Sequence, residues 1–235
     1  MTTIFWAGDS TVKQNTILTF PQTGIGQAFD RYTRRYHVQI ANFAENGRST
    51  KQFIDEGRLI PIYDQIKQGD FLFIQFGHND EKVDDPARYA DPDGEFCVNL
   101  EKFVNVARNK GAYPVLITPL TRRNFRDPSH KFTHDRWAQA MRRTGEKLSV
   151  PVVDLTKMSE ELVDSLPPEQ SAKLYMNIPA GVYRHYPEGK TDDTHLQPEG
   201  AIVFAGLIAR GLKQLGGVYA DLLCTEYDQW MEEQK

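Results

Sequence analysis

Short apolar runs recur along the 235 residues of this chain and alternate with longer periodic segments. Each run holds mostly β-branched and aromatic side chains and is bounded by turn formers, a pattern typical of buried strands. The predicted strands cover residues 4–7, 38–43, 71–76, 115–118 and 152–155.

Apolar residues between these runs recur every three or four positions, as on one face of a helix. The segments with this spacing are residues 96–107, 137–148 and 201–215. Pro198 lies where the first turn of the last helix is expected. The stretch after Ser49 is also helical in pattern, and Pro61 is expected to kink or end it.

Alternation of strands and helices predicts a parallel sheet with helices on both faces. We therefore expect an α/β fold, a three-layer α/β/α domain with a five-stranded sheet in the flavodoxin-like order 2-1-3-4-5. The sequence has no internal repeat or linker, so residues 1–235 are expected to form a single domain. A tail from about residue 217 carries Tyr219, Leu222, Tyr227 and Trp230 and should dock on the core or on a partner.

Composition narrows the classes of partner. The net charge is −4 and the sequence has no basic stripe, which excludes nucleic acid as an expected partner. The apolar runs are too short to cross a bilayer, and the first residues do not read as a secretory signal, so a cytoplasmic enzyme is expected. Cys97 and Cys224 lack metal-ligand spacing and are expected to be reduced thiols. No metal or cofactor is expected, and a homodimer is left open.

Polar clusters follow three consecutive predicted strands, and a fourth precedes the last predicted helix. They are Gly8-Asp9-Ser10-Thr11, Glu45-Asn46-Gly47-Arg48-Ser49-Thr50, Gly77-His78-Asn79-Asp80 and Asp192-Asp193-Thr194-His195. Ligands of open parallel sheets bind beyond the carboxyl ends of the strands. All four clusters are therefore expected to meet at one edge of the sheet.

The residue types in these clusters match the needs of acyl transfer. Ser10 follows a strand and a turn glycine, which would expose its hydroxyl as a nucleophile. His195 is suited to be the general base, and Asp192, three residues earlier, can reach its Nδ1–H. The backbone N–H groups of Ser10 and Gly47 and the amide of Asn79 are candidate oxyanion donors.

Each cluster taken alone also has a purely structural explanation, such as a helix cap or a turn. Two other classes of function remain open at this point. A metal-dependent phosphoesterase would leave Ser10 unexplained and would gather around a metal pair the residues Asp9, His78, Asn79, Asp80, Asp192 and His195. A non-catalytic carbohydrate-binding protein would not need a complete set of triad and oxyanion residues.

The four clusters together resemble the blocks of the SGNH (GDSL-like) hydrolase superfamily, over nearly the whole chain. Ser10, Gly47, Asn79 and His195 stand at the block positions that give the superfamily its name. Three features resemble the rhamnogalacturonan acetylesterase branch more closely than the GDSL lipases. They are the continuation Ser10-Thr11-Val12, the segment Gly77-His78-Asn79-Asp80 and the segment 118–123.

The resemblance implies an SGNH hydrolase fold and a serine esterase that removes acetyl groups from pectic rhamnogalacturonan oligosaccharides. Arginine forks suit carboxylates, so the substrate-binding candidates include three arginines near the clusters. The full candidate set is Arg48, His78, Arg122, Arg123 and Tyr183. Within the esterases, an acetylxylan-type enzyme and a broad short-chain acyl esterase or thioesterase stay open.

Overall fold

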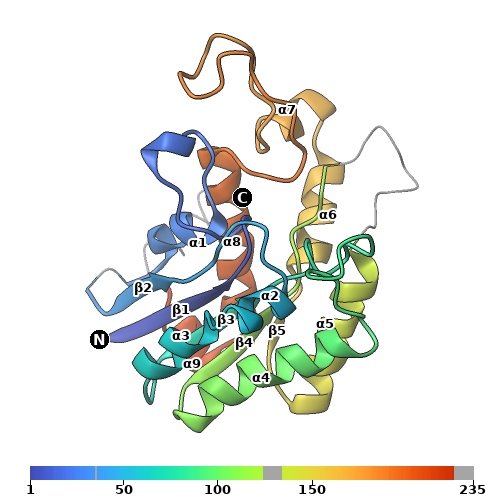
Figure 1. Ribbon diagram of the computed structural model, residues 1–235. Coiled ribbons are helices and arrows are strands. Elements are labelled where there is room, and N and C mark those ends of the chain that lie inside the picture. Colours follow the sequence, from blue (N-terminus) through green and yellow to red (C-terminus); the bar gives the residue numbers. More distant parts are fainter. Residues whose placement is uncertain (35, 124–133, 225–235) are drawn as a thin grey trace.

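Five parallel strands form one sheet in the order β2-β1-β3-β4-β5, which confirms the predicted fold class. The computed structural model describes residues 1–34, 36–123 and 134–224. The strands are β1 (Thr2–Gly8), β2 (Val38–Asn42), β3 (Phe71–Gln75), β4 (Tyr113–Ile117) and β5 (Val152–Val153). Because neighbouring strands are parallel, their carboxyl ends all lie at the same edge of the sheet (Figure 1).

Helices cover both faces of this sheet (Figure 1). The longer ones are α4 (Glu95–Asn109), α5 (Asp135–Leu148), α6 (Leu155–Ser165) and α8 (Pro198–Leu215). The shorter ones are α1 (Ile25–Ala28), α2 (Thr50–Asp55), α3 (Leu59–Gln65), α7 (Pro168–Ala172), α9 (Gly217–Ala220) and two 3-10 turns at Ile17–Thr19 and Phe29–Tyr32. The helices predicted over residues 96–107, 137–148 and 201–215 are all present.

Successive side chains of each strand enter different hydrophobic cores, as the alternation of a pleated strand requires. Ile4 and Trp6 of β1 lie in one core with residues of α1, α6 and α8. Phe5 and Ala7 lie in the other core with residues of α4 and α5. Burial on both faces explains why the strands read as continuous apolar runs rather than as alternating ones.

Two local expectations are wrong. The strand predicted at residues 152–155 ends at Val153, because the Asp154 side chain accepts a hydrogen bond from Lys157 N and begins α6. Pro61 does not interrupt the helix after Ser49. The break comes earlier, at Gly57 with φ +70°, and Pro61 lies in the first turn of α3, where a missing N–H leaves no helical bond unmade.

The described part of the tail lies on the core. Leu222 and Leu223 are buried, and Cys224 N donates to Tyr32 O (3.0 Å). Tyr227 and Trp230, which were also expected to be buried, lie outside the described residues. No helix within the described ranges is long and apolar enough to cross a membrane.

Candidate active site

The first loop of the site is a tight turn directly after β1. Gly8 leaves no room for a side chain, because a Cβ there would lie 2.4 Å from Val12 Cγ2 and 2.8 Å from Gln75 O. The buried Asp9 carboxylate accepts hydrogen bonds from Thr11 N (2.9 Å) and Thr11 Oγ1 (2.8 Å), which closes the turn. Ser10 is held between these residues and stays partly exposed.

Backbone pairing brings the second loop beside the first. Glu45 N donates to Gly8 O (3.1 Å), which continues the pairing of β2 with β1 beyond the end of the strand. Gly47 then turns the chain with φ +73°, a conformation that favours glycine. The backbone N–H groups of Ser10 and Gly47 donate no hydrogen bond within the described chain, so both are available to a bound oxyanion.

Asn79 lies on the third loop, after β3, and its side chain connects that loop to the second one. Asn79 Nδ2 donates to Arg48 O (3.2 Å). An amide nitrogen carries two hydrogens, so one N–H remains for a ligand. The three predicted oxyanion donors therefore come from three neighbouring loops at the carboxyl edge of the sheet.

His195 joins Ser10 to Asp192 through its two ring nitrogens. His195 Nε2 lies 2.9 Å from Ser10 Oγ, and Asp192 Oδ2 lies 2.8 Å from His195 Nδ1. With a proton on Nδ1 the ring donates to Asp192 and accepts from the Ser10 hydroxyl. This is the arrangement in which a serine proton can move to an imidazole.

Asp192 accepts more hydrogen bonds than the one from the His195 ring. Its Oδ1 accepts from Thr194 N (2.9 Å) and His195 N (3.0 Å), and Lys190 Nζ lies 2.8 Å from its Oδ2. Burial alone would raise the pKa of Asp192, but His195 and Lys190 hold it well below its usual range. Asp192 is therefore an anion at neutral pH, and Lys190 is a contact that no sequence motif indicated.

The segment that carries His195 is held on both sides. His195 O accepts a hydrogen bond from Met176 N (2.8 Å), and Thr23 N donates to Leu196 O (2.9 Å). Arg123 Nη1 donates to Asp193 Oδ1 (2.9 Å) and thereby braces the residue after Asp192. Figure 1 shows the segment between α7 and α8, which includes this loop, projecting beyond the sheet.

A second buried carboxyl group lies close to Asn79. Asp80 Oδ1 accepts from Thr50 N (2.8 Å) and Thr50 Oγ1 (2.6 Å), which connects the third loop to the start of α2. Complete burial raises the pKa of Asp80 to about 7, and the nearby Asp9 charge adds to this rise. Asp80 is thus a buried structural acid with its proton partly retained near neutral pH.

The predicted substrate-binding residues occupy different environments. Arg48 donates to Glu56 Oε2 (3.0 Å) and Asn46 O (2.8 Å) and remains partly exposed. Arg123 is mostly buried in its contact with Asp193, which assigns it a bracing role in the loop.

His78 and Arg122 lie close together, with Arg122 Nη2 3.5 Å from His78 O. His78 is 3% exposed, so its ring does not form part of the surface. Arg122 pairs with Glu81 (2.9 Å) and is partly exposed. Of these two candidates, only the arginine has a surface that a ligand could reach.

Tyr183 lies on the loop before Asp192 and contacts Phe20 edge to face, with ring centroids 5.7 Å apart. It lines a cleft of about 420 Å³ together with Lys173, Asn177 and Glu199. Asn177 also accepts a hydrogen bond from Asp192 N (3.2 Å). This cleft therefore borders the Asp192 loop.

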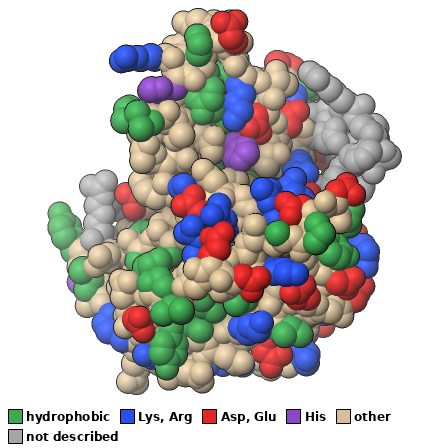
Figure 2. Space-filling view, in the orientation of Figure 1, with side chains coloured by type: hydrophobic (Ala, Val, Ile, Leu, Met, Phe, Trp, Pro, Cys, Tyr) green, Lys and Arg blue, Asp and Glu red, His purple; other side chains and the backbone are tan. Residues whose placement is uncertain are grey.

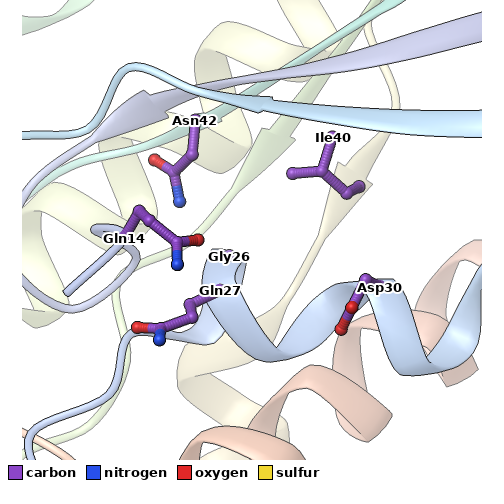
Figure 3. Close-up of a pocket in the computed structure, with 6 residues that line it drawn as sticks. All are labelled: Gln14, Gly26, Gln27, Asp30, Ile40 and Asn42. Carbon is purple, nitrogen blue, oxygen red and sulfur yellow. The ribbon is translucent and has the colours of Figure 1, made fainter. Parts of the chain in front are cut away.

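A separate polar hollow lies between α1 and β2 (Figure 3). The amides of Gln14, Gln27 and Asn42 gather at one end of it, and Asp30 and Ile40 lie at the other. None of its lining residues belongs to the triad or to the predicted oxyanion donors. The hollow is thus distinct from the site at Ser10.

Within residues 1–34, 36–123 and 134–224, no group of three or more His, Cys, Asp and Glu side chains is arranged to hold a metal ion. The donor set that the phosphoesterase alternative requires is therefore not assembled there.

The face shown in Figure 2 has acidic and basic side chains interspersed, without a basic stripe.

The chain is similar to known proteins over most of its length. Residues 7–201 match the GDSL-like Lipase/Acylhydrolase family. Rhamnogalacturonan acetylesterase RhgT of Bacillus subtilis (strain 168) is 38% identical over 215 residues, which cover 91% of this chain and 90% of that protein. Probable rhamnogalacturonan acetylesterase YesY of the same organism is 36% identical and covers 91% of this chain and 93% of that protein.

Solved structures have the same fold. Protein YXIM from Bacillus subtilis superposes with a TM-score of 0.75 at 25% identity, covering 92% of this chain and 57% of that one. Axe2, an acetylxylan esterase from Geobacillus stearothermophilus, has a TM-score of 0.63 at 15% identity and covers 89% of this chain and 93% of that one. At that identity the likeness concerns the fold alone.

Proposed function

The chain belongs to the GDSL-like lipase/acylhydrolase family and is a carboxylic ester hydrolase, and we propose that it deacetylates pectic rhamnogalacturonan oligosaccharides through an acyl-enzyme on Ser10. The observation that carries the mechanism is the hydrogen-bonded series Ser10, His195 and Asp192. The two relatives at 36% and 38% identity support the substrate class.

In the first half of the reaction, Ser10 Oγ attacks the acetyl carbonyl carbon and its proton moves to His195 Nε2. The Oγ–C bond forms, and the carbonyl oxygen becomes an oxyanion that Ser10 N–H, Gly47 N–H and Asn79 Nδ2 stabilise. Asp192 stabilises the imidazolium. The bond from the carbonyl carbon to the sugar oxygen then breaks, and His195 returns the proton to that oxygen, which leaves a free sugar hydroxyl.

In the second half, water attacks the acetyl-serine carbonyl and gives a proton to His195 Nε2. The same donors stabilise the second oxyanion. When the C–Oγ bond breaks, His195 returns the proton to Ser10 and acetate leaves. The enzyme ends in its starting state, so one water is consumed for each acetyl group released.

Acetate release tests both parts of the proposal. Three substrates are compared: acetylated rhamnogalacturonan oligosaccharides, acetylated xylan oligosaccharides and p-nitrophenyl acetate. The variants are Ser10→Ala and, as a matched control, Ser165→Ala, which removes an exposed hydroxyl at the end of α6. We expect Ser10→Ala to lower kcat by about 10⁴-fold or more on every substrate, and Ser165→Ala to match the wild type.

Release that is fastest on the pectic oligosaccharides and depends on Ser10 would support both the substrate and the mechanism. Faster release from the xylan oligosaccharides would refute the substrate and keep the mechanism. Activity in Ser10→Ala close to that of the wild type would refute the acyl-enzyme on this serine.

A further inference from the structure

Buried and partly buried ionisable side chains lie in contact with one another next to the Ser10 turn, and they belong neither to the triad nor to the oxyanion donors. The group consists of Asp9, His78, Glu81, Arg122 and His134. Asp9, His78 and His134 are each at most 3% exposed. Burying ionisable groups costs free energy that contacts within the protein must offset, so the contacts within the group show which segments it joins.

One contact of this group joins two loops that carry oxyanion donors. Asp9 Oδ2 lies 3.4 Å from His78 Nδ1, a charged contact longer than an ordinary N–H···O hydrogen bond, and both side chains are buried. Asp9 directly precedes Ser10, and His78 directly precedes Asn79. The contact therefore joins the residue before Ser10 to the residue before Asn79. Ser10 and Asn79 carry two of the three predicted oxyanion donors.

The other oxygen of the Asp9 carboxylate shapes the turn itself. Oδ1 accepts both hydrogen bonds from Thr11, on the far side of Ser10. Burial raises the pKa of Asp9, but attraction to His78 and the Thr11 hydrogen bonds bring it below the usual value. Asp9 is thus an anion that faces His78 with one oxygen and holds the Ser10 turn with the other.

The His78 ring also contacts His134, from the segment before α5, and Glu81 of its own loop holds that second histidine. The rings of His78 and His134 lie 4.2 Å apart, and His134 Nδ1 lies 2.7 Å from Glu81 Oε2. Burial lowers the pKa of His134 to about 4, so its ring is neutral near pH 7 and donates to Glu81. Arg122 pairs with the other Glu81 oxygen and lies 3.5 Å from His78 O. The His78 ring is therefore held between Asp9 and His134.

We propose that His78 is a positioning residue that acts through Asp9 and sets the separation of the Ser10 and Asn79 oxyanion donors. This inference rests on the proposed function, because it names residues that position the donors of that same oxyanion site. The donors act on the transition state rather than on the bound ester. Loss of the His78 contact should therefore lower kcat and leave KM nearly unchanged.

The experiment compares His78→Ala, His78→Asn and the wild type in p-nitrophenyl acetate hydrolysis. End-point labelling of Ser10 with a fluorophosphonate, counted by mass spectrometry, gives the number of active sites. We expect His78→Ala to lower kcat per labelled site by about 30- to 100-fold. Asparagine places an amide N–H near the position of imidazole Nδ1, so His78→Asn should recover most of that loss. His37→Ala, at an exposed histidine before β2, is the matched control.

A double-mutant cycle tests whether His78 acts through Asp9. Asp9→Asn keeps the shape of the side chain and an oxygen for Thr11, but removes the charge that faces His78. We expect its kcat loss to resemble that of His78→Ala, and the double variant to lose little more than either single one. If His78→Ala does not fold, Asp9→Asn carries the test, with lower kcat and unchanged KM expected.

Three results with the His78 variants would overturn the inference. They are a kcat per labelled site in His78→Ala within about twofold of the wild type, a His78→Asn variant as slow as His78→Ala, and fully additive losses in the double variant. An unchanged kcat in Asp9→Asn would do the same. Absence of Ser10-dependent hydrolysis in the wild type would instead refute the proposed function, so the two failures are distinguishable.

Discussion

Replacing Asp192 with asparagine should disable the base of the proposed triad without changing its shape. The two oxygens of Asp192 have different partners: Oδ1 accepts from two backbone N–H groups, and Oδ2 faces His195 Nδ1 and Lys190 Nζ. Asparagine has a single side-chain oxygen, so it can accept either from the two backbone N–H groups or from His195 and Lys190, but not from both. If it keeps the two backbone donors, its NH₂ group faces the ring and the ammonium group, both of which are also donors.

The consequence for His195 follows from its two nitrogens. To avoid the NH₂ group, the ring would move its proton from Nδ1 to Nε2, which lies 2.9 Å from Ser10 Oγ. A protonated Nε2 cannot accept the serine proton. The imidazolium formed in the reaction would also lose its neighbouring anion. We expect Asp192→Asn to lower kcat by about 10³- to 10⁴-fold, or roughly 4–5.5 kcal/mol in activation free energy.

Stopped-flow hydrolysis of p-nitrophenyl acetate measures this loss, with KM expected to stay within a few-fold because Asp192 contacts His195 rather than the ester. Asp193→Asn is the matched control, since Asp193 pairs with Arg123 and Asn177. That variant should keep most of the wild-type kcat. An Asp192→Asn enzyme that retained more than about a tenth of the wild-type kcat would refute the tautomer argument.

Two further predictions concern Asp80 and Gly47. The pKa of Asp80 rises from 3.8 to about 7 on folding, so its contribution to stability is complete below about pH 4 and is lost as the pH rises to about 7. Asp80→Asn should remove this pH-dependent loss of folding stability, which amounts to a few kcal/mol at about 1.4 kcal/mol per pKa unit. Thermal unfolding of both proteins across this pH range measures the difference. Gly47→Ala should lower the free energy of unfolding by about 1 kcal/mol, because φ is +73° there. It should also lower kcat at least about tenfold by displacing an oxyanion donor, as urea unfolding and ester hydrolysis measure.

Each of these has its own control. Glu160, whose pKa is also raised to about 7, is common to the wild type and Asp80→Asn, so parallel stability curves for the two proteins would contradict the assignment to Asp80. Gly69 also has a positive φ, +83°, and a Cβ there would meet nothing within 4 Å. Gly69→Ala should therefore lose stability and keep its kcat, and an equal kcat in the two glycine variants would contradict the role of Gly47.

The parallel sheet could be predicted from the sequence because its strands are buried on both faces. Runs such as Phe71–Gln75 are apolar at almost every position, and the helices between them carry one apolar face. Local boundaries were less predictable. Val152–Val153 forms only two residues of strand because the Asp154 side chain caps the next helix, and a single polar side chain of this kind is hard to distinguish from an ordinary loop residue.

The residues of the site could likewise be located, because parallel strands deliver the loops that follow them to one edge. Ser10, Gly47 and Asn79 each follow a strand and could be placed there before any contact was known. The residues that hold these site residues in place could not be predicted. Lys190 beside Asp192 and His134 against His78 carry no motif, because they act only through contacts made after the loops have packed.

The sequence by itself thus determined the order of the layers, the edge of the sheet that carries the polar loops, and the residue types available there. Only the tertiary structure decided which atoms meet. Ser10 and His195 are 185 positions apart, and Asp9 faces a histidine from another strand's loop. Periodicity is set by whether each residue lies against the core or the solvent, whereas such contacts depend on how whole loops pack against each other.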